Sequence, residues 1–397
     1  MRRFWSLSAA GFAATAIGFG PGRMGFGLFV PEFRTAFSMS TTAVGLVSSL
    51  GFLGFFIGLL IAQALLDRRG PRAPVLCGLA AATFGMGIVA LAPSLPVLAG
   101  GVFVAASSAG LAWSPFNNAI HRFVSEDDRP AALSMVSTGT GIGVALAGLA
   151  AFAMVIEGIS WRYCWGFFTI ASAVALAGNW LAFRDMETDD SGRQGQGWGV
   201  LAQVATRPLV LVGFTYGTVS AIYISFAADH MVTAGGLAGM DVRATPALVF
   251  ICYGLIGLTG LWTGRLRNLL GLSMLLRLLM LAGAVSLALV VLMPGSWGGL
   301  ILSAGLQGVH VMMTSAVLAF WSERMFPALP SRSFTVALLA AAAGSVLGPA
   351  AAGVVSDAFG AGVMFGGAAA LAVATGLWLR PSHVQDYPVT EEDREAA

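Results

Sequence analysis

Residues 20–31 read Gly-Pro-Gly-Arg-Met-Gly-Phe-Gly-Leu-Phe-Val-Pro, and they place Arg23 inside an apolar run from about Leu7 to Glu32. At about 1.5 Å of rise per residue, a helix of that length crosses a hydrocarbon core roughly 30 Å thick. A charge at that depth costs at least about 2.5–3.5 kcal/mol unless it faces a wet cavity or a partner. The glycines and Pro21 favour a broken helix that lines a cavity. The stretch therefore predicts a membrane protein with a functional arginine in its first span.

A structural role for Arg23 is the alternative, in which its long side chain reaches an interface or pairs with a helix-end carbonyl. Arginine keeps its charge in proteins, so neutralisation does not remove the problem. Both interpretations require the guanidinium to find a polar or aqueous surrounding.

The composition places the whole chain in a lipid bilayer. It is 57% hydrophobic and 10% charged, with a mean hydropathy of +0.82, whereas a soluble domain is about 25% charged. The net charge of +2 and the lack of a basic tract argue against a nucleic-acid partner. Cys77, Cys164 and Cys252 each stand alone, so we expect neither disulfides nor metal ligands, and no cofactor. The chain contains neither an H-E-x-x-H motif nor a phosphate-binding loop, so we do not expect an enzyme.

Apolar segments long enough to span a bilayer recur twelve times. They lie near 7–30, 42–66, 74–92, 97–120, 131–156, 161–183, 208–228, 244–264, 272–293, 297–320, 333–355 and 361–380. A polar stretch at residues 184–207 divides them into two groups of six. The sequence predicts an all-α integral membrane protein whose twelve transmembrane helices form two pseudo-symmetric six-helix bundles. We expect a first bundle at 1–183, a cytoplasmic linker at 184–207, a second bundle at 208–380 and a cytoplasmic tail at 381–397.

The arginines outside the spans are distributed unevenly between the two sides of the membrane. With the N-terminus inside, sixteen lie in cytoplasmic segments, and only Arg34, Arg162 and Arg243 lie on the opposite side. Under the positive-inside rule this asymmetry predicts that both termini are cytoplasmic. Asp229 and Asp357 fall near span ends on the outer side, where we expect water to reach them.

The two halves also repeat small-residue spacings. Gly139-x-x-x-Gly143 in the fifth span matches Gly344-x-x-x-Gly348 in the eleventh, at an offset of roughly half the chain. Internal duplication of membrane helices is typical of transporters that rock one half against the other around a central site.

Residues 63–72, Gln-Ala-Leu-Leu-Asp-Arg-Arg-Gly-Pro-Arg, resemble the loop between the second and third helices of the major facilitator superfamily. Asp67, Arg68, Gly70 and Arg72 match its pattern, and Gln63 stands where the family usually has glycine. Asp67 can cap a neighbouring helix N-terminus and pair with an arginine, which would make these four residues a cytoplasmic conformational latch. The alternative is a positive-inside anchor with a turn at Gly70.

Within that superfamily, Arg23-x-Gly25-x-Gly27 followed by Pro31 resembles a bacterial branch and is similar to the monocarboxylate and oxalate:formate exchanger families. The fifth span departs from the drug:proton exporter signature, because Val144 replaces its proline. We therefore expect a multi-pass, monomeric protein of the bacterial plasma (inner) membrane.

The resemblance implies that the first, fourth, seventh and tenth helices line a central cavity. Their polar and aromatic residues are the candidate substrate-binding set: Arg23, Trp113, Asn117, Asn118, Tyr216, Tyr223, Gln307 and His310. His310 lies in the middle of its span, and a histidine with an ordinary pKa of about 6.5 can carry a proton in the working range. The alternative for His310 is a neutral hydrogen bond between helices. The tyrosines and Trp113 can equally be packing residues.

We therefore predict a secondary active transporter that moves a small organic solute, a carboxylate, across the membrane by alternating access. Arg23 would bind the carboxylate, and a proton is the candidate coupling ion. The alternative is a drug or metabolite efflux carrier in which Arg23 serves structure alone.

Overall fold

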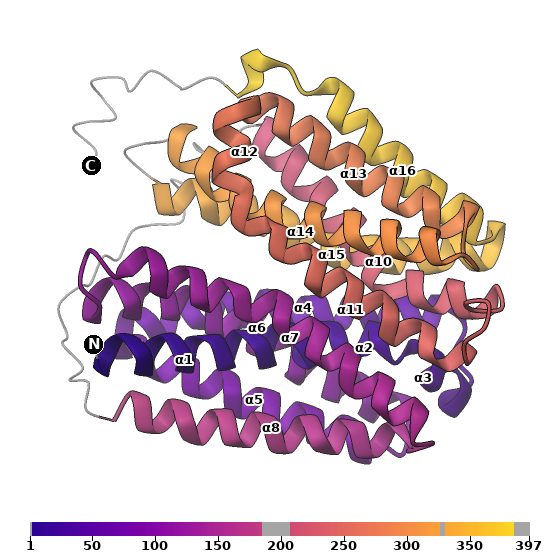
Figure 1. Cartoon of the computed structure of the whole chain (residues 1–397), viewed down its shortest axis with the longest axis horizontal. Coiled ribbons are helices and arrows are strands. Elements are labelled where there is room, and N and C mark those ends of the chain that lie inside the picture. Colours follow the sequence, from indigo (N-terminus) through magenta and orange to yellow (C-terminus); the bar gives the residue numbers. More distant parts are fainter. Residues whose placement is uncertain (1, 185–206, 326–329, 385–397) are drawn as a thin grey trace.

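The computed structural model describes residues 2–184, 207–325 and 330–384; for residues 2, 3, 114, 323–325 and 330–333 only the backbone is described. The described parts are helical throughout and contain no strand (Figure 1). The predicted linker at 184–207 and tail at 381–397 lie outside these ranges except for a few end residues. Their boundaries remain predictions.

Six membrane-spanning segments form the N-terminal half. Its helices are α1 (Arg2–Ile17), the π-helix η1 (Gly18–Met24), α2 (Gly25–Leu28), α3 (Val30–Phe37), α4 (Thr41–Arg69), α5 (Arg72–Leu91), α6 (Leu95–Phe123), α7 (Arg129–Ile156) and α8 (Trp161–Ala182). The first span is the broken series α1, η1 and α2, and α3 follows it.

Six further spans form the C-terminal half. Its helices are α10 (Arg207–Thr233), the short η2 (Val242–Ala244), α11 (Thr245–Gly257), η3 (Leu258–Trp262), α12 (Thr263–Leu270), α13 (Leu272–Leu292), α14 (Trp297–Met325), α15 (Pro330–Phe359), α16 (Ala361–Trp378) and η4 (Pro381–His383). Eleven single segments of the described chain are long and apolar enough to cross a membrane. The broken first span is the twelfth, so the predicted fold class is confirmed.

The break in the first span is a consequence of its sequence. Pro21 has no amide hydrogen to donate and sits inside the π-helical turn, and regular i to i−4 bonding resumes where the Gly25 amide donates to the Pro21 carbonyl. Gly20 lies so close to α7 that a side-chain carbon there would collide with the Gly143 carbonyl. The wider π-helical turn and the close approach to α7 together set the direction in which the Arg23 side chain projects from η1.

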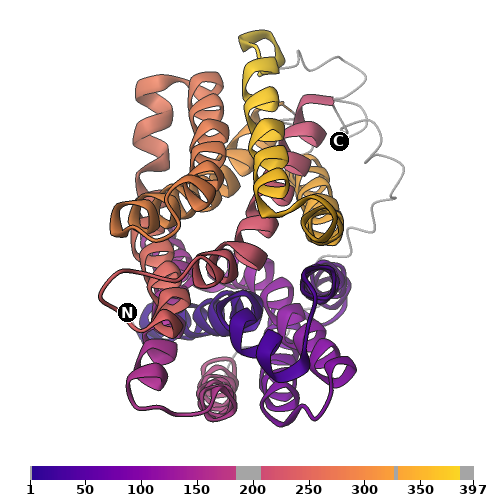
Figure 2. The ribbon, with the colours of Figure 1, turned by 90° about the vertical axis from the view of Figure 1, so that its right-hand side faces the viewer.

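The two halves touch at one end of the molecule and separate at the other. They meet beside α2, α3 and α11 (Figures 1 and 2), and in Figure 1 their ribbons diverge toward the end where α1 begins and α16 ends, which are the termini of the described chain. The packing agrees, because one large apolar cluster contains residues of both halves, such as Phe29 and Ala227. At the other end each half has its own cluster, around Phe116 in the N-terminal half and Trp321 in the C-terminal half.

Candidate functional site

A cavity of about 510 Å³ lies between the halves. Its wall is formed by η1, α4, α6 and α7 of the N-terminal half and by α10, α14 and α15 of the C-terminal half, with the α11–η3 junction. Leu59 of α4 and Leu338 of α15 both line the cavity. The same two helices are in backbone contact farther along, at Gly45 of α4 and Pro349 of α15, so the cavity lies toward the other ends of this helix pair.

Four of the predicted binding residues line this cavity: Arg23, Trp113, Asn117 and Tyr216. They come from η1, α6 and α10, so the structure brings the first, fourth and seventh spans together as expected. The Tyr216 hydroxyl donates to the Val311 carbonyl at 3.4 Å, which turns the tyrosine toward α14.

Arg23 is the only charged side chain among the described residues of the cavity wall. Its guanidinium carbon lies 4.2 Å from the ring centre of Phe55, 5.5 Å from Phe52 and 5.7 Å from Phe19. Each ring face attracts a cation through its quadrupole, by about 0.5–2 kcal/mol. No acidic side chain within the described ranges forms an ion pair with Arg23, and its Nε has no hydrogen-bond partner there.

The rings around Arg23 continue into an aromatic wall. Phe19 meets Phe55 edge to face at 6.3 Å between centroids, and it meets Trp113 in the same way at 5.9 Å. Phe19, Phe55 and Trp113 line the cavity together with Arg23. The site therefore combines one fixed positive charge with a large apolar surface.

The wall also contains residues that sequence reasoning missed, on α4, α7, α15 and the α11–η3 junction. Phe55 comes from the second span, and a stripe of hydroxyl side chains comes from the fifth, neither of which belongs to the four helices that the resemblance implies. The stripe on α7 consists of Ser134, Ser137, Thr138 and Thr140. A signal was available for it, since polar residues spaced three and four apart share one face of a helix.

The other four predicted binding residues lie away from the described wall. Tyr223, Gln307 and His310 are buried inside the C-terminal half, and Asn118 is half-buried beside the wall residue Asn117. The Tyr223 hydroxyl accepts a hydrogen bond from Ser303 at 3.2 Å. Their part in substrate binding stays a prediction.

His310 is held by a bond between helices. Its Nδ1 donates to the Leu279 carbonyl of α13 at 2.8 Å, and its ring lies 5.6 Å from that of Tyr216. This contact matches the hydrogen-bonding alternative for His310. Tyr216 lines the cavity, and His310, which lies outside the described wall, is next to Tyr216.

The residues of the predicted latch lie at the end of α4 and the turn after it. The side chains of Asp67 and Arg68 are exposed, and Gly70 adopts a positive φ of 65° at the helix end. The Gly70 amide donates to the Leu66 carbonyl, which closes α4. Asp67 forms no ion pair within the described chain, so a latching role for it and for Arg72 stays a prediction.

Comparison with known proteins identifies the class to which this site belongs. The family model of the Major Facilitator Superfamily matches residues 12–276, about two thirds of the chain. The chain therefore belongs to this superfamily, a family of membrane transporters, and the resemblance seen in the sequence is confirmed.

Two curated relatives match the chain over part of their length. The chain is 30% identical over 173 residues to monocarboxylate transporter 13 of Rattus norvegicus, and 29% identical over 174 residues to the Bos taurus protein of that name. Each alignment covers 43% of this chain and 39% of the relative. The chain thus matches less than half of the length of these relatives.

Solved transporter structures share the fold along almost the whole chain. A POT family transporter in complex with 5-aminolevulinic acid matches with a TM-score of 0.75 at 15% identity, covering 95% of each chain. The nucleoside transporter NupG matches with a TM-score of 0.76 at 14% identity, covering 94% of this chain and 98% of that one. A bacterial homolog of the human lysosomal transporter Spinster, in an inward-facing and unoccupied conformation, matches with a TM-score of 0.66 at 17% identity. This match covers 95% of this chain and 94% of that one. At these identities the matches show the fold alone.

Proposed function

We propose that this transporter moves a small organic anion with a single carboxylate and an apolar body, by alternating access between the two halves. One observation carries the proposal: in the described wall of a cavity of about 510 Å³, Arg23 is the single charged side chain. One cation without a neighbouring acid favours a monoanion through Coulomb attraction in a low-dielectric surrounding. The match to monocarboxylate transporters supports the same substrate class.

The wall assigns a role to each part of the substrate. The guanidinium fork can donate two parallel hydrogen bonds to a carboxylate. Phe55, Phe19 and Trp113 offer ring faces and edges to the apolar body, and the hydroxyl stripe on α7 can bind a further polar group. A proton is the proposed coupling ion, with His310 as the candidate carrier behind Tyr216.

Arg23→Gln tests the carboxylate site. Hydrogen bonds to charged groups contribute about 1.5–3 kcal/mol, so we expect binding to weaken by about 10- to 100-fold. The measurement is thermal-shift titration of purified protein with a panel of monocarboxylates and their primary amides. Arg23→Lys should bind with intermediate affinity, because it keeps the charge and loses the fork.

Arg267→Gln is the matched control, since Arg267 also stacks on a phenylalanine (4.9 Å from Phe320) but lies outside the cavity. It should leave carboxylate binding unchanged. Equal binding of acids and amides, or carboxylate binding that survives Arg23→Gln, would contradict the proposal.

The three phenylalanine rings around Arg23 favour a second function. They stabilise the guanidinium within the protein, so Arg23 can have a purely structural role and need not bind the substrate. In that case the protein is an efflux carrier for apolar drugs or metabolites. Resistance profiling of an expressing strain separates the two functions: efflux predicts higher tolerance to apolar toxins that persists in Arg23→Gln.

A further inference from the structure

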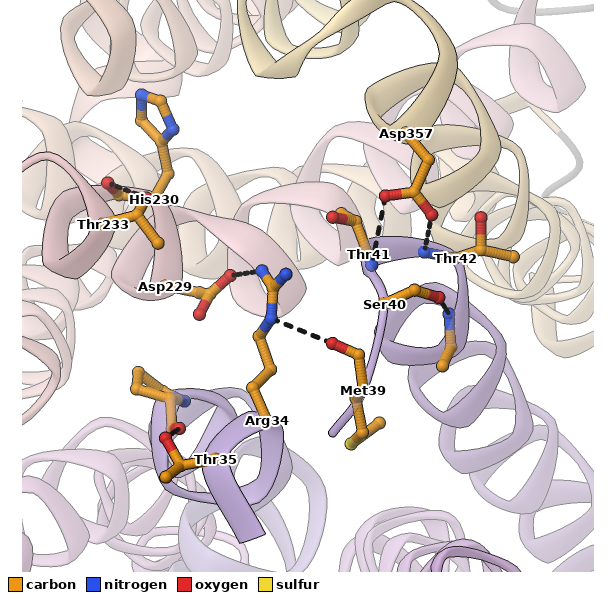
Figure 3. A network of polar contacts seen from close by, with 12 residues as sticks. Arg34, Thr35, Met39, Ser40, Thr41, Thr42, Asp229, His230, Thr233 and Asp357 are labelled. Atoms are coloured by element: carbon orange, nitrogen blue, oxygen red, sulfur yellow. Dashed lines mark hydrogen bonds and ion pairs between the residues drawn. The ribbon is translucent and has the colours of Figure 1, made fainter. Parts of the chain in front are cut away.

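An ion pair joins the two halves at the end far from the termini. Arg34 of α3 donates through Nη1 to Asp229 of α10 at 2.6 Å, and its Nε donates to the Met39 carbonyl at 3.2 Å (Figure 3). The side chain of Asp229 is only 8% exposed. A buried carboxylate that loses its partner is strongly disfavoured, so this pair holds the halves together as long as water stays out.

A second polar contact crosses between the halves on the same face. Asp357, near the C-terminal end of α15, accepts hydrogen bonds from the amides of Thr41 at 3.2 Å and Thr42 at 2.8 Å (Figure 3). These amides open α4 and have no partner within their own helix. The Ser40 hydroxyl satisfies the next one, at Ala43. The start of α4 is thus capped partly by the other half of the protein.

The helices that carry the cap are in backbone contact at this end. A side-chain carbon at Gly45 of α4 would collide with the Pro349 carbonyl of α15, and one at Gly353 would lie 2.7 Å from the Thr41 carbonyl. Position 41 faces 353 and position 45 faces 349, so the two helices run antiparallel. Toward their other ends, Leu59 of α4 and Leu338 of α15 both line the cavity. One helix pair is therefore closed at one end and open at the other.

We propose that the Arg34–Asp229 ion pair and the Asp357 cap on α4 act together as a latch that keeps the face far from the termini closed while the cavity faces the other side. For the cavity to open on this face, both contacts must break, because each joins one half to the other. The proposal rests on the alternating access proposed above. It adds the residues that hold one of the two states.

Cysteine accessibility tests the latch without any substrate. In a background with Cys77, Cys164 and Cys252 changed to alanine, Ile224→Cys reports the closed face and Leu59→Cys reports the open cavity. Ile224 is buried at the contact between the halves, where its carbonyl touches Gly27. The probe is a water-soluble maleimide added to purified full-length protein, and the readout is the rate of labelling.

We expect Ile224→Cys to react slowly and Leu59→Cys quickly in the parent protein. Arg34→Gln and Asp357→Asn should each raise the Ile224→Cys rate, and the double variant by at least about tenfold. The Leu59→Cys rate should fall at the same time, because in alternating access the cavity closes on the side of Leu59 when it opens on the face far from the termini. Denatured protein labels fast at both positions, so misfolding is recognised by both rates rising together.

Two further variants decide whether the ion pair acts through its charges. Arg34→Asp places two carboxylates together and should open the face, and Asp229→Arg added to it should restore slow Ile224→Cys labelling. Asp241→Asn is the control, because Asp241 pairs with Arg243 at a similar 2.7 Å but within one loop of the C-terminal half. Labelling that is unchanged in every latch variant, or a charge exchange that fails to restore it, would overturn the proposal. A failure of carboxylate binding in the Arg23 experiment would leave this result standing.

Discussion

Arg23 is accommodated in the membrane by ring faces and an open cavity, with no acid of the described chain beside it. Its closest ring is that of Phe55, at 4.2 Å. Aromatic rings attract the cation without neutralising it, which is consistent with the proposed role of Arg23 in binding an anion.

Phe55→Leu should lower the free energy of unfolding by about 0.5–2 kcal/mol, the range of one cation–π contact, and weaken carboxylate binding. Phe55→Trp should preserve both, because indole is the strongest of the aromatic partners. Thermal unfolding in detergent and ligand titration measure the two effects. The control is Phe84→Leu at an outward position that is 71% exposed; an equal loss there would show that the effect at Phe55 is not specific.

Glu32 is a second residue with an unusual surrounding. It lies in α3, beyond the first span, and its Oε2 is buried without a hydrogen-bond partner among the described residues. Burial raises the pKa of this carboxyl from 4.5 to about 7; nearby Arg243 lowers it and Asp229 raises it. The folded protein therefore holds a proton on Glu32 that the unfolded chain releases at a lower pH.

The sign of the pH dependence follows from that difference. Below about pH 4.5 both states are protonated, and between about 4.5 and 7 the unfolded chain ionises first, so stability falls as pH rises. We expect Glu32→Gln to be more stable than the parent at pH 8, by up to about 3 kcal/mol, and the advantage to vanish near pH 4. Thermal unfolding across this range measures it. A Glu32→Gln effect that does not change with pH would contradict the prediction.

At the scale of elements, α4 and α15 control how closely the halves approach. Gly45→Ala should push α15 away through the Pro349 carbonyl, which destabilises the closed face by about 1–3 kcal/mol. The expected results are a lower unfolding temperature and faster maleimide labelling at Ile224→Cys. Gly178→Ala on α8 is the control, since nothing lies within 4 Å of the added carbon; there the greater helix propensity of alanine should stabilise slightly. Equal behaviour of the two variants would contradict a role for close approach.

For the whole molecule, the halves share one apolar core at the end far from the termini, and each half has a core of its own at the other end. The uneven arginine distribution predicts that the termini are cytoplasmic. A C-terminal fusion to green fluorescent protein should therefore fluoresce in a bacterial host, and a fusion to alkaline phosphatase should be inactive. The reverse pattern would invert the predicted orientation and, with it, the side to which the cavity opens.

The sequence alone determined the fold class and the helices. Apolar run length predicted all twelve spans, because in lipid the backbone must bond within each segment and hydropathy then marks each spanning segment. It did not predict that the eighth span is divided into α11, η3 and α12. The sequence also identified Arg23, since a charge inside an apolar run is visible without coordinates. Four of the eight predicted binding residues lie on the described cavity wall, and they come from three of the four helices that the resemblance implied.

Only the tertiary structure decided which side chains meet. Phe55 of the second span packs against the Arg23 guanidinium. Arg34 pairs with Asp229 of the other half, and Asp229 is buried there although the sequence predicted that water would reach it. Hydropathy reports whether a residue enters the membrane, but it carries no information about the rotation of one helix against another. That rotation turned His310 into the C-terminal half and brought Asp357 to the start of α4, because packing between helices sets it.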